Sequence, residues 1–289
     1  MRGYTLSSGN SIPSVGLGTS GGDFQDVVKI VKNAIDSGYR HIDTGANYKN
    51  EEMVGEAIKD SNIPRGEFFI TTKLWCTDLL PERVRPALEL SLKKLQVEYV
   101  DLYLIHWPVA FKSPQTTPPE VIPVDLSETW KELEALVFEG KIKSIGVSNF
   151  TIKKLDKLLE TARIKPAVNQ VELHPYLTQL DLKNYCDENN ILLSAYSPLG
   201  RSEVPRIDSD PTILQISEKY KKKPAQIMLN WAVQRGTAVV PRSSNLQRQK
   251  DNLEQFALDQ SDMDSISNLN RNHRYIDKAE WGIQNIFSD

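Results

Sequence analysis

The chain has 289 residues, and its 35 Lys and Arg against 38 Asp and Glu give a formal net charge of −3. This near balance supplies no basic surface for nucleic acid or an anionic membrane. With 39% hydrophobic residues, no apolar run near the roughly 18 residues of a transmembrane helix and no secretory leader, we expect a folded cytoplasmic protein. Two cysteines cannot build a disulfide framework or a four-ligand zinc site, and no two histidines stand at metal-ligand spacing, so we expect no metal.

A short hairpin is the first expected element, because a polar turn at 7–10 separates two short strand-like runs. Stretches with the 3.6-residue spacing of amphipathic helices, such as 27–35, 130–137 and 152–159, alternate with further strand-like runs. Those runs lie at 14–17, 40–43, 68–73, 100–106, 142–147, 167–171, 191–196 and 237–240. The alternation predicts a parallel sheet covered by helices.

The number of strands favours a closed (β/α)8 barrel, a TIM barrel, with the N-terminal hairpin capping the barrel bottom. A six-stranded doubly wound sheet with an extra subdomain is the alternative fold. No break in composition marks a linker, and the proline-rich loop 114–123 lies within one strand-to-helix connection. We therefore expect a single barrel domain over residues 1–289. Within the strand at 40–43, His41 alternates with Ile42 and is expected to face the helices.

The segment 16–21 reads Gly-Leu-Gly-Thr-Ser-Gly and matches the dinucleotide-binding pattern G-x-G-x-x-G, with Asp43 about twenty residues later. That pattern needs a firm strand before it, whereas the run at 11–15 is short and contains a proline. We therefore favour a glycine-rich barrel loop that lets a ligand approach closely.

Three ionisable residues, Asp43, Lys73 and His106, stand at the ends of three successive predicted strands. In a βα barrel these strand ends carry the active site. Tyr48 follows in the next loop, and its phenol, with an ordinary pKa of about 10, is too weak an acid near neutral pH. A neighbouring ammonium lowers that pKa, and a carboxylate holds the ammonium charged and in place. The set predicts a general acid for carbonyl reduction.

Each of the four residues also has a structural interpretation when taken alone. Tyr48 fits a half-buried packing tyrosine, and Lys73 fits a solvated surface lysine. Asp43 fits a helix N-cap, and His106 fits a core histidine with satisfied hydrogen bonds. Their shared position at the strand ends favours the catalytic interpretation.

Four segments of the chain resemble the signatures of the aldo-keto reductases, in particular those of the aldose and xylose reductase branch. They are Gly38-Tyr39-Arg40-His41-Ile42-Asp43-Thr44 with Tyr48 and Asn50-Glu51, Leu104-Ile105-His106-Trp107-Pro108, Gly146-Val147-Ser148-Asn149-Phe150, and Val240-Pro241-Arg242-Ser243-Ser244-Asn245. The resemblance covers nearly the whole chain, and its motifs occur in order.

This resemblance implies that a nicotinamide cofactor, NADPH, lies across the barrel mouth and that the enzyme reduces aldehydes or ketones to alcohols. It implies small aldehydes, sugars or other carbonyl metabolites as substrates, and a monomer or weak homodimer. It also implies that Tyr48 is the general acid, that Lys73 lowers its pKa and is held by Asp43, and that His106 orients the carbonyl.

The same resemblance assigns the cofactor residues. Ser148, Asn149 and Gln170 match the residues that hold the nicotinamide carboxamide, Tyr196 the tyrosine that stacks on the ring, and Ser197 and Leu199 positions along the pyrophosphate. Arg242, Ser243 and Arg248 match the pocket for the 2′-phosphate, Asn252 matches an adenine contact, and Thr19, Ser244 and Asn245 complete the set. At position 242 the family more often has lysine. The alternative interpretation of Arg242 and Arg248 is that they are ordinary solvent-exposed charged side chains at the start of a helix.

The substrate pocket departs further from the family pattern. Trp75 and Trp107 match two aromatic walls, whereas Ser20 stands where many members have a tryptophan, which implies a more open and more polar site. The tail 271–289, with His273, Tyr275 and Trp281 in it, is expected to cover the pocket. Cys76, next to Trp75, is either an oxidation-sensitive thiol or a small filler.

Two other functions stay open from the sequence. The fold of the family also serves as a cofactor-sensing regulatory subunit, and a barrel aldolase could use Lys73 as a Schiff base. Turnover of a small aldehyde separates the reductase from the sensor, and borohydride trapping of substrate on Lys73 separates the aldolase.

Overall fold

Eight parallel strands form one curled sheet in the computed structural model, which describes residues 3–21, 26–113, 118–278, 281 and 286–287. In sheet order they are β3 (Leu17–Gly18), β4 (His41–Asp43), β5 (Phe69–Leu74), β6 (Val100–Ile105), β9 (Ile142–Ser148), β10 (Val168–Glu172), β11 (Leu192–Tyr196) and β12 (Ala238–Val239). The order follows the chain, as the expected barrel requires, and the doubly wound alternative is wrong.

The first and last strands of the sheet are also joined. Val15 and Val239 form a parallel bridge, and the Gly16 amide donates to the Val239 carbonyl at 2.8 Å. The Gly18 amide donates to the Pro241 carbonyl at 3.1 Å. These bonds close the curled sheet into a TIM-barrel-like fold, which confirms the predicted fold class.

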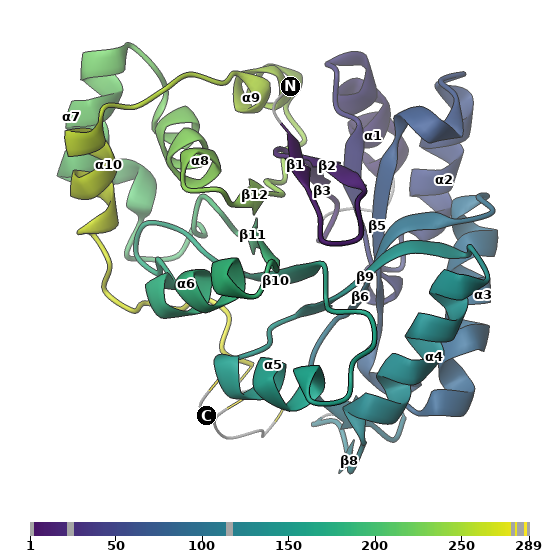
Figure 1. Ribbon diagram of the computed structural model, residues 1–289. Coiled ribbons are helices and arrows are strands. Elements are labelled where there is room, and N and C mark those ends of the chain that lie inside the picture. The colour runs from purple at the N-terminus through teal and green to yellow at the C-terminus, as the bar shows by residue number, and fades with distance from the viewer. Residues whose placement is uncertain (1–2, 22–25, 114–117, 279–280, 282–285, 288–289) are drawn as a thin grey trace.

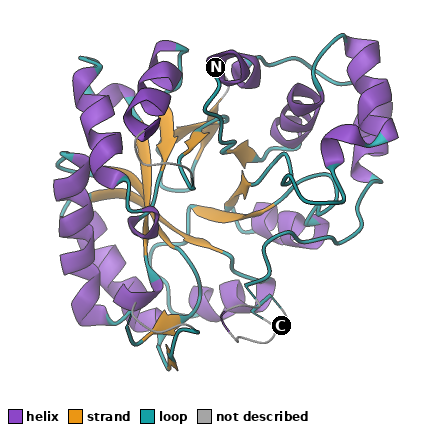
Figure 2. Ribbon diagram, turned by 180° about the vertical axis from the view of Figure 1, so that it is seen from behind, coloured by secondary structure: helices purple, strands orange, loops and turns teal. Residues whose placement is uncertain are grey.

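Helices surround the sheet on its outer side, purple around orange in Figure 2. They are α1 (Val27–Asp36), α2 (Glu51–Asp60), α3 (Pro81–Leu95), α4 (Leu126–Phe138), α5 (Ile152–Leu159), α6 (Leu180–Glu188), α7 (Pro211–Tyr220), α8 (Pro224–Gln234), α9 (Leu246–Leu253) and α10 (Gln260–Ser267). Helix α1 shows why they form: Val27, Val31, Ala34 and Ile35 share one face and are buried against the sheet. Gly38, with φ of +105°, ends it in the left-handed conformation that favours glycine.

The N-terminal hairpin closes the bottom of the barrel. It consists of β1 (Gly3–Thr5) and β2 (Ser11–Pro13), paired antiparallel. Ile12 is buried among Phe69 at the start of β5 and Ala167 just before β10, which lie at the amino ends of their strands. The opposite end, where the carboxyl ends of the strands meet, is therefore the open face.

Three sequence expectations differ from the structure in detail. The run at 14–17 forms a strand only at Leu17–Gly18. A second small hairpin pairs β7 (Ala110–Phe111) with β8 (Val121–Ile122), and β8 lies within the expected loop 114–123, of which residues 114–117 lie outside the described residues. His41 faces the barrel interior rather than the helices, with Nε2 3.1 Å from Thr71 Oγ1, because alternation along β4 places it on the same face as Asp43.

The glycines of segment 16–21 serve the packing of the barrel. A Cβ on Gly18 would meet the Val240 carbonyl oxygen at 2.6 Å, and one on Gly16 would meet the His41 ring at 2.5 Å. Gly18 belongs to the first barrel strand, so the dinucleotide-fold interpretation of this motif is wrong. Among the helices of the described residues, none is long and apolar enough to cross a membrane.

Candidate active site

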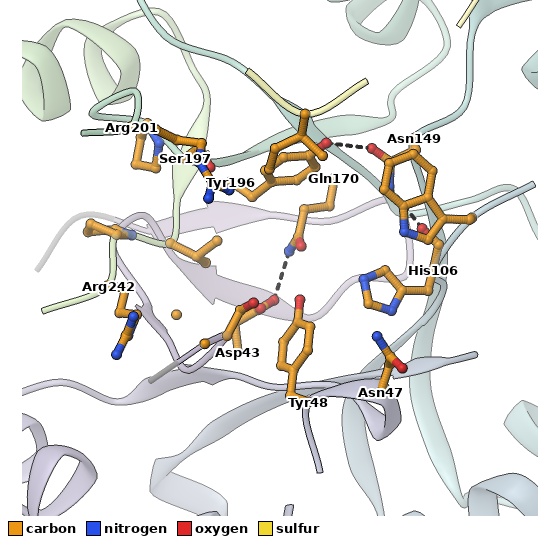
Figure 3. A pocket seen from close by; sticks show the side chains of 18 of the residues that line it. Asp43, Asn47, Tyr48, His106, Asn149, Gln170, Tyr196, Ser197, Arg201 and Arg242 are labelled. Carbon is orange, nitrogen blue, oxygen red and sulfur yellow. Dashed lines mark hydrogen bonds between the residues drawn. The ribbon is translucent and has the colours of Figure 1, made fainter. Parts of the chain in front are cut away.

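A cavity of about 950 Å³ opens at the carboxyl ends of the barrel strands (Figure 3). Twelve of the residues predicted for the site line it: Ser20, Asp43, Tyr48, Trp75, His106, Trp107, Asn149, Gln170, Tyr196, Ser197, Leu199 and Arg242. The others do not line it: Thr19, Lys73, Ser148, Ser243, Ser244, Asn245, Arg248 and Asn252. Tertiary structure thus brings residues from all eight strands of the sheet, or from the loops that follow them, to one cavity.

Lys73 and Asp43 form a buried ion pair behind the cavity wall. The Lys73 side chain has no exposed surface, and its Nζ donates to Asp43 Oδ1 at 2.6 Å and to the Thr44 carbonyl at 2.7 Å. Burial alone disfavours the charged amine, but the Asp43 carboxylate and Tyr48 outweigh it and raise the pKa of Lys73. The lysine therefore stays an ammonium ion at neutral pH.

Tyr48 lies beside this ammonium, at the end of the short 3-10 turn Ala46–Tyr48, and its hydroxyl points into the cavity (Figure 3). Lys73 Nζ is 4.9 Å from the centre of the Tyr48 ring. Burial raises the pKa of the phenol, while the charge of Lys73 and hydrogen bonds from Lys73 and Ser20 act to lower it. The net shift of the pKa is upward, so Tyr48 keeps its proton at neutral pH, and the Lys73 charge lies where it would stabilise a phenolate.

His106 follows β6 and stands next to Tyr48 and Trp75, with ring centroids 5.5 Å and 5.0 Å away. Burial and the charges of Lys73 and Lys278 hold the pKa of His106 well below its usual range. A neutral imidazole carries one N–H donor. His106 can therefore donate a hydrogen bond to a neutral oxygen without carrying a charge into the cavity.

Two side-chain amides extend the cavity wall away from Tyr48. The Gln170 amide nitrogen donates to Asp43 Oδ2 at 2.7 Å, and the Tyr196 hydroxyl donates to Asn149 Oδ1 at 2.8 Å (Figure 3). Both amides are buried, and both come from the middle strands of the sheet or the turns after them. With its nitrogen engaged, Gln170 offers its carbonyl oxygen to an N–H donor.

Thr19 and Ser148 lie behind the wall rather than on it. The Thr19 hydroxyl donates to the Asp43 carbonyl at 3.0 Å, and the Ser148 hydroxyl donates to the Gln170 carbonyl at 2.8 Å. Short hydroxyl side chains at strand ends satisfy nearby backbone acceptors in this way. In the structure these two residues support the backbone of Asp43 and Gln170 and do not line the cavity.

The positively charged end of the cavity carries Arg242 and Arg201, on the side away from His106 (Figure 3). Arg248 is exposed in the first turn of α9, where the Asn245 side chain caps the helix by accepting its backbone amide at 3.0 Å. A helix N-terminus with exposed arginine attracts anions. Asn252 is buried, with a hydrogen bond to Tyr39.

An aromatic wall closes the side of the cavity near His106. Trp281 of the tail packs edge-on against Trp75, Trp107 and Phe111, with centroid distances of 5.9, 5.1 and 5.1 Å. Cys76 is buried behind this wall, and burial raises the pKa of its thiol, which favours the interpretation as a small filler. Ile276, Lys278 and Trp281 all line the cavity, so the described part of the tail borders it.

Sequence reasoning missed several lining residues, notably Asn47, Arg201 and Lys278. Asn47 directly precedes Tyr48, and this position in the sequence could have indicated that Asn47 also lines the cavity. Arg201 and Lys278 lie in irregular segments whose course depends on contacts far away in the sequence. Within the described part of the chain, no group of three or more His, Cys, Asp or Glu side chains is placed to hold a metal ion.

Comparisons with known proteins identify the family and agree with this fold. A model of the aldo/keto reductase family matches residues 14–271. The chain is 41% identical over 284 residues to a glycerol 2-dehydrogenase (NADP(+)) of Saccharomyces cerevisiae, across 92% of this chain and 90% of the relative. It is 41% identical over 292 residues to aldo-keto reductase family 1 member A1 of Homo sapiens, across 94% and 90%. The solved aldose reductase of Schistosoma japonicum superposes with a TM-score of 0.93 at 37% identity, covering 98% of this chain and 97% of that one.

A barrel-like fold with a buried lysine–aspartate pair beside a cavity tyrosine places the chain among carbonyl-reducing oxidoreductases. The chain belongs to the aldo/keto reductase family, which reduces small-molecule carbonyl compounds with NADP(H).

Proposed function

We propose that this chain is an NADPH-dependent reductase that converts aldehydes and ketones to alcohols, with small aldehydes, sugars or other carbonyl metabolites as substrates. The observation that carries the proposal is the buried Asp43–Lys73 pair, whose ammonium lies 4.9 Å from the ring of Tyr48 on the cavity wall. A positive charge held at that distance stabilises a phenolate that forms during proton transfer.

The chemistry of the donor set fits a nicotinamide dinucleotide. Neutral amides, Asn149 and Gln170, stand near Tyr48, and an uncharged carboxamide needs such partners. Arg242 stands at the other end of the cavity, with Arg248 exposed on the neighbouring helix α9, and their guanidinium groups suit phosphate oxygens. Ser243, Ser244 and Asn245 precede α9 and offer hydroxyl and amide donors there. When bound, the dinucleotide supplies the hydride that reduces the carbonyl carbon.

The protein contributes proton transfer and orientation. Tyr48 donates its phenolic proton to the carbonyl oxygen, and the Lys73 ammonium stabilises the phenolate left behind. Asp43 keeps Lys73 charged, and Gln170 fixes the second carboxylate oxygen of Asp43. Neutral His106 donates a hydrogen bond to the same carbonyl oxygen and sets the direction from which Tyr48 reaches it.

The buried Lys73 argues against the aldolase alternative. A Schiff-base lysine attacks as the neutral amine. Here Asp43 and Tyr48 raise the pKa of Lys73 despite its burial, and the side chain has no exposed surface. The ammonium therefore serves as a fixed charge rather than a nucleophile.

The test is consumption of NADPH with glyceraldehyde, xylose, a nitrobenzaldehyde and a diketone, each repeated with NADH. Turnover with NADPH well above that with NADH supports the proposed reaction and cofactor. NADPH binding without turnover of any of these compounds would instead support the sensing subunit. We further propose that the chain is a single barrel domain and that its tail 271–289 covers the substrate pocket. The cytoplasmic location stays a prediction, and so does the oligomeric state of a monomer or weak homodimer.

A further inference from the structure

Glu172, the last residue of β10, carries a carboxylate that the proposed mechanism does not use. Its side chain has no exposed surface, although it lies on the same face of β10 as Gln170, two residues before it. Burying a charged carboxylate is unfavourable unless hydrogen-bond donors surround it. The partners of this carboxylate therefore indicate what it does.

Among the described residues, three donors contact the Glu172 carboxylate, and two of them are consecutive backbone amides of the tail. The Tyr275 amide donates to Oε1 at 2.7 Å, and the Ile276 amide donates to Oε2 at 3.0 Å. The third donor is His174 Nε2, 3.0 Å from Oε1. Hydrogen bonds to a charged acceptor are stronger than neutral ones. Both oxygens of one buried carboxylate thus bind the tail to the end of a barrel strand.

The tail reaches the cavity directly at this point. In Figure 1 the yellow chain leaves α10 and passes α6 toward α5. Ahead of the contact with Glu172, the tail is already held to the barrel, because the amides of Arg271 and His273 donate to the Tyr176 carbonyl at 3.1 and 3.0 Å. Ile276 then lines the cavity, followed by Lys278 and Trp281. Trp281 completes the aromatic wall with Trp75, Trp107 and Phe111.

We propose that Glu172 is a positioning residue that anchors the tail at residues 275–276 and thereby sets which carbonyl substrates the pocket accepts. It acts through Ile276 and Trp281, and it does not touch the reacting atoms. The anchoring follows from the contacts above, whereas the effect on substrate choice rests on the proposed function.

The first test is hydrogen exchange of the tail amides in Glu172→Gln. The glutamine has only one acceptor oxygen, so one of the two backbone hydrogen bonds is lost. Its NH₂ group then faces the N–H of the other backbone amide, and two donors oppose each other. We expect exchange over residues 271–278 to accelerate by about tenfold or more. Unchanged exchange in a folded Glu172→Gln protein would overturn the anchor.

Glu134→Gln is the matched control. Glu134 is also buried and also accepts two consecutive backbone amides, those of Arg163 at 2.7 Å and Ile164 at 2.9 Å. Both of these amides donate to Oε1, so the glutamine can keep the two bonds through its one oxygen, and the variant removes a buried carboxylate on the outer helix α4 without changing the tail contacts. Acceleration of tail exchange in both variants would mean general destabilisation and would overturn the proposal.

The second test is substrate choice. In Glu172→Gln we expect the KM for a nitrobenzaldehyde, which uses the aromatic wall, to rise by about tenfold, with the KM for NADPH unchanged. Adding Trp281→Ala should remove most of this effect, because both changes act through the same wall. An equal rise for glyceraldehyde, the nitrobenzaldehyde and NADPH would contradict a role in substrate choice.

A variant on the tail itself keeps the proposal testable if Glu172→Gln does not fold. Ile276→Pro removes the amide that donates to Glu172 Oε2, and Ile276→Ala keeps it. We expect faster tail exchange in the proline variant than in the alanine variant, and equal exchange would refute the anchor. If no carbonyl compound is turned over, the proposed function fails, while the exchange comparison still decides the anchor.

Discussion

Removal of the Lys73 ammonium tests the central element of the site. At 4.9 Å from the centre of the Tyr48 ring, with an effective dielectric constant of about 20, one full charge pair contributes about 3.4 kcal/mol. If the phenolate is fully developed in the transition state, Lys73→Met therefore lowers kcat by roughly 300-fold. The KM for NADPH should change little, because Lys73 does not line the cavity.

The same substitution leaves the Asp43 carboxylate buried without its ammonium. Breaking a buried pair costs about 3–5 kcal/mol. For 289 residues this corresponds to a fall in Tm of about 5–8 °C. The double variant Lys73→Met/Asp43→Asn removes both charges and should recover much of this Tm, while its kcat stays low.

Steady-state kinetics with glyceraldehyde and thermal unfolding of the three variants separate the two effects. Lys183→Met is the control, since it breaks the partly exposed pair with Asp187 on α6 and should affect neither quantity strongly. Wild-type kcat in Lys73→Met, or recovery of kcat together with Tm in the double variant, would refute the reasoning.

Three further predictions follow from named contacts. Tyr48→Phe removes the proposed acid and should abolish reduction while NADPH binding, followed by fluorescence, is preserved; wild-type kcat would show that the acid is another group. Arg242→Ala/Arg248→Ala should raise the KM for NADPH far more than that for NADH, and equal effects would place the 2′-phosphate site elsewhere. Burial lowers the pKa of His41 to about 4, against about 6.5 in the unfolded chain. Below about pH 6.5 the unfolded chain therefore binds more protons than the folded chain. As the pH is lowered, the free energy of unfolding decreases, by up to about 3 kcal/mol from this group. His41→Gln should flatten that fall in urea midpoints between about pH 6.5 and 4, and an unchanged slope would assign it to other groups.

Local patterns were sufficient for most of the fold. Helix α1 follows from the spacing of Val27, Val31 and Ala34, and its end follows from Gly38, because helix periodicity and a left-handed cap depend on neighbours within a few residues. The order of strands and helices then predicts the barrel, since parallel strands need helical crossovers. Asp43 and His106 fell at strand ends for the same reason, which is why the sequence places them in one site.

Other features depend on contacts between distant segments. His41 was expected to face the helices, because the residue pattern of a three-residue strand does not reveal which face is the barrel interior. Thr19 and Ser148 match cofactor positions by sequence, yet their hydroxyls bind backbone carbonyls behind the wall.

The anchor of the tail is the clearest such case. Glu172 and Tyr275 are 103 residues apart, and nothing in either local sequence indicates that a buried carboxylate will accept that backbone amide. Periodicity and motifs record the preferences of a segment, and they identified the barrel and predicted a set of residues that the structure brings to one cavity or directly behind its wall. Only folding buries the Glu172 carboxylate and brings the amides of a distant segment to it as donors. These contacts place Ile276 on the cavity wall, where no local sequence pattern could have placed it.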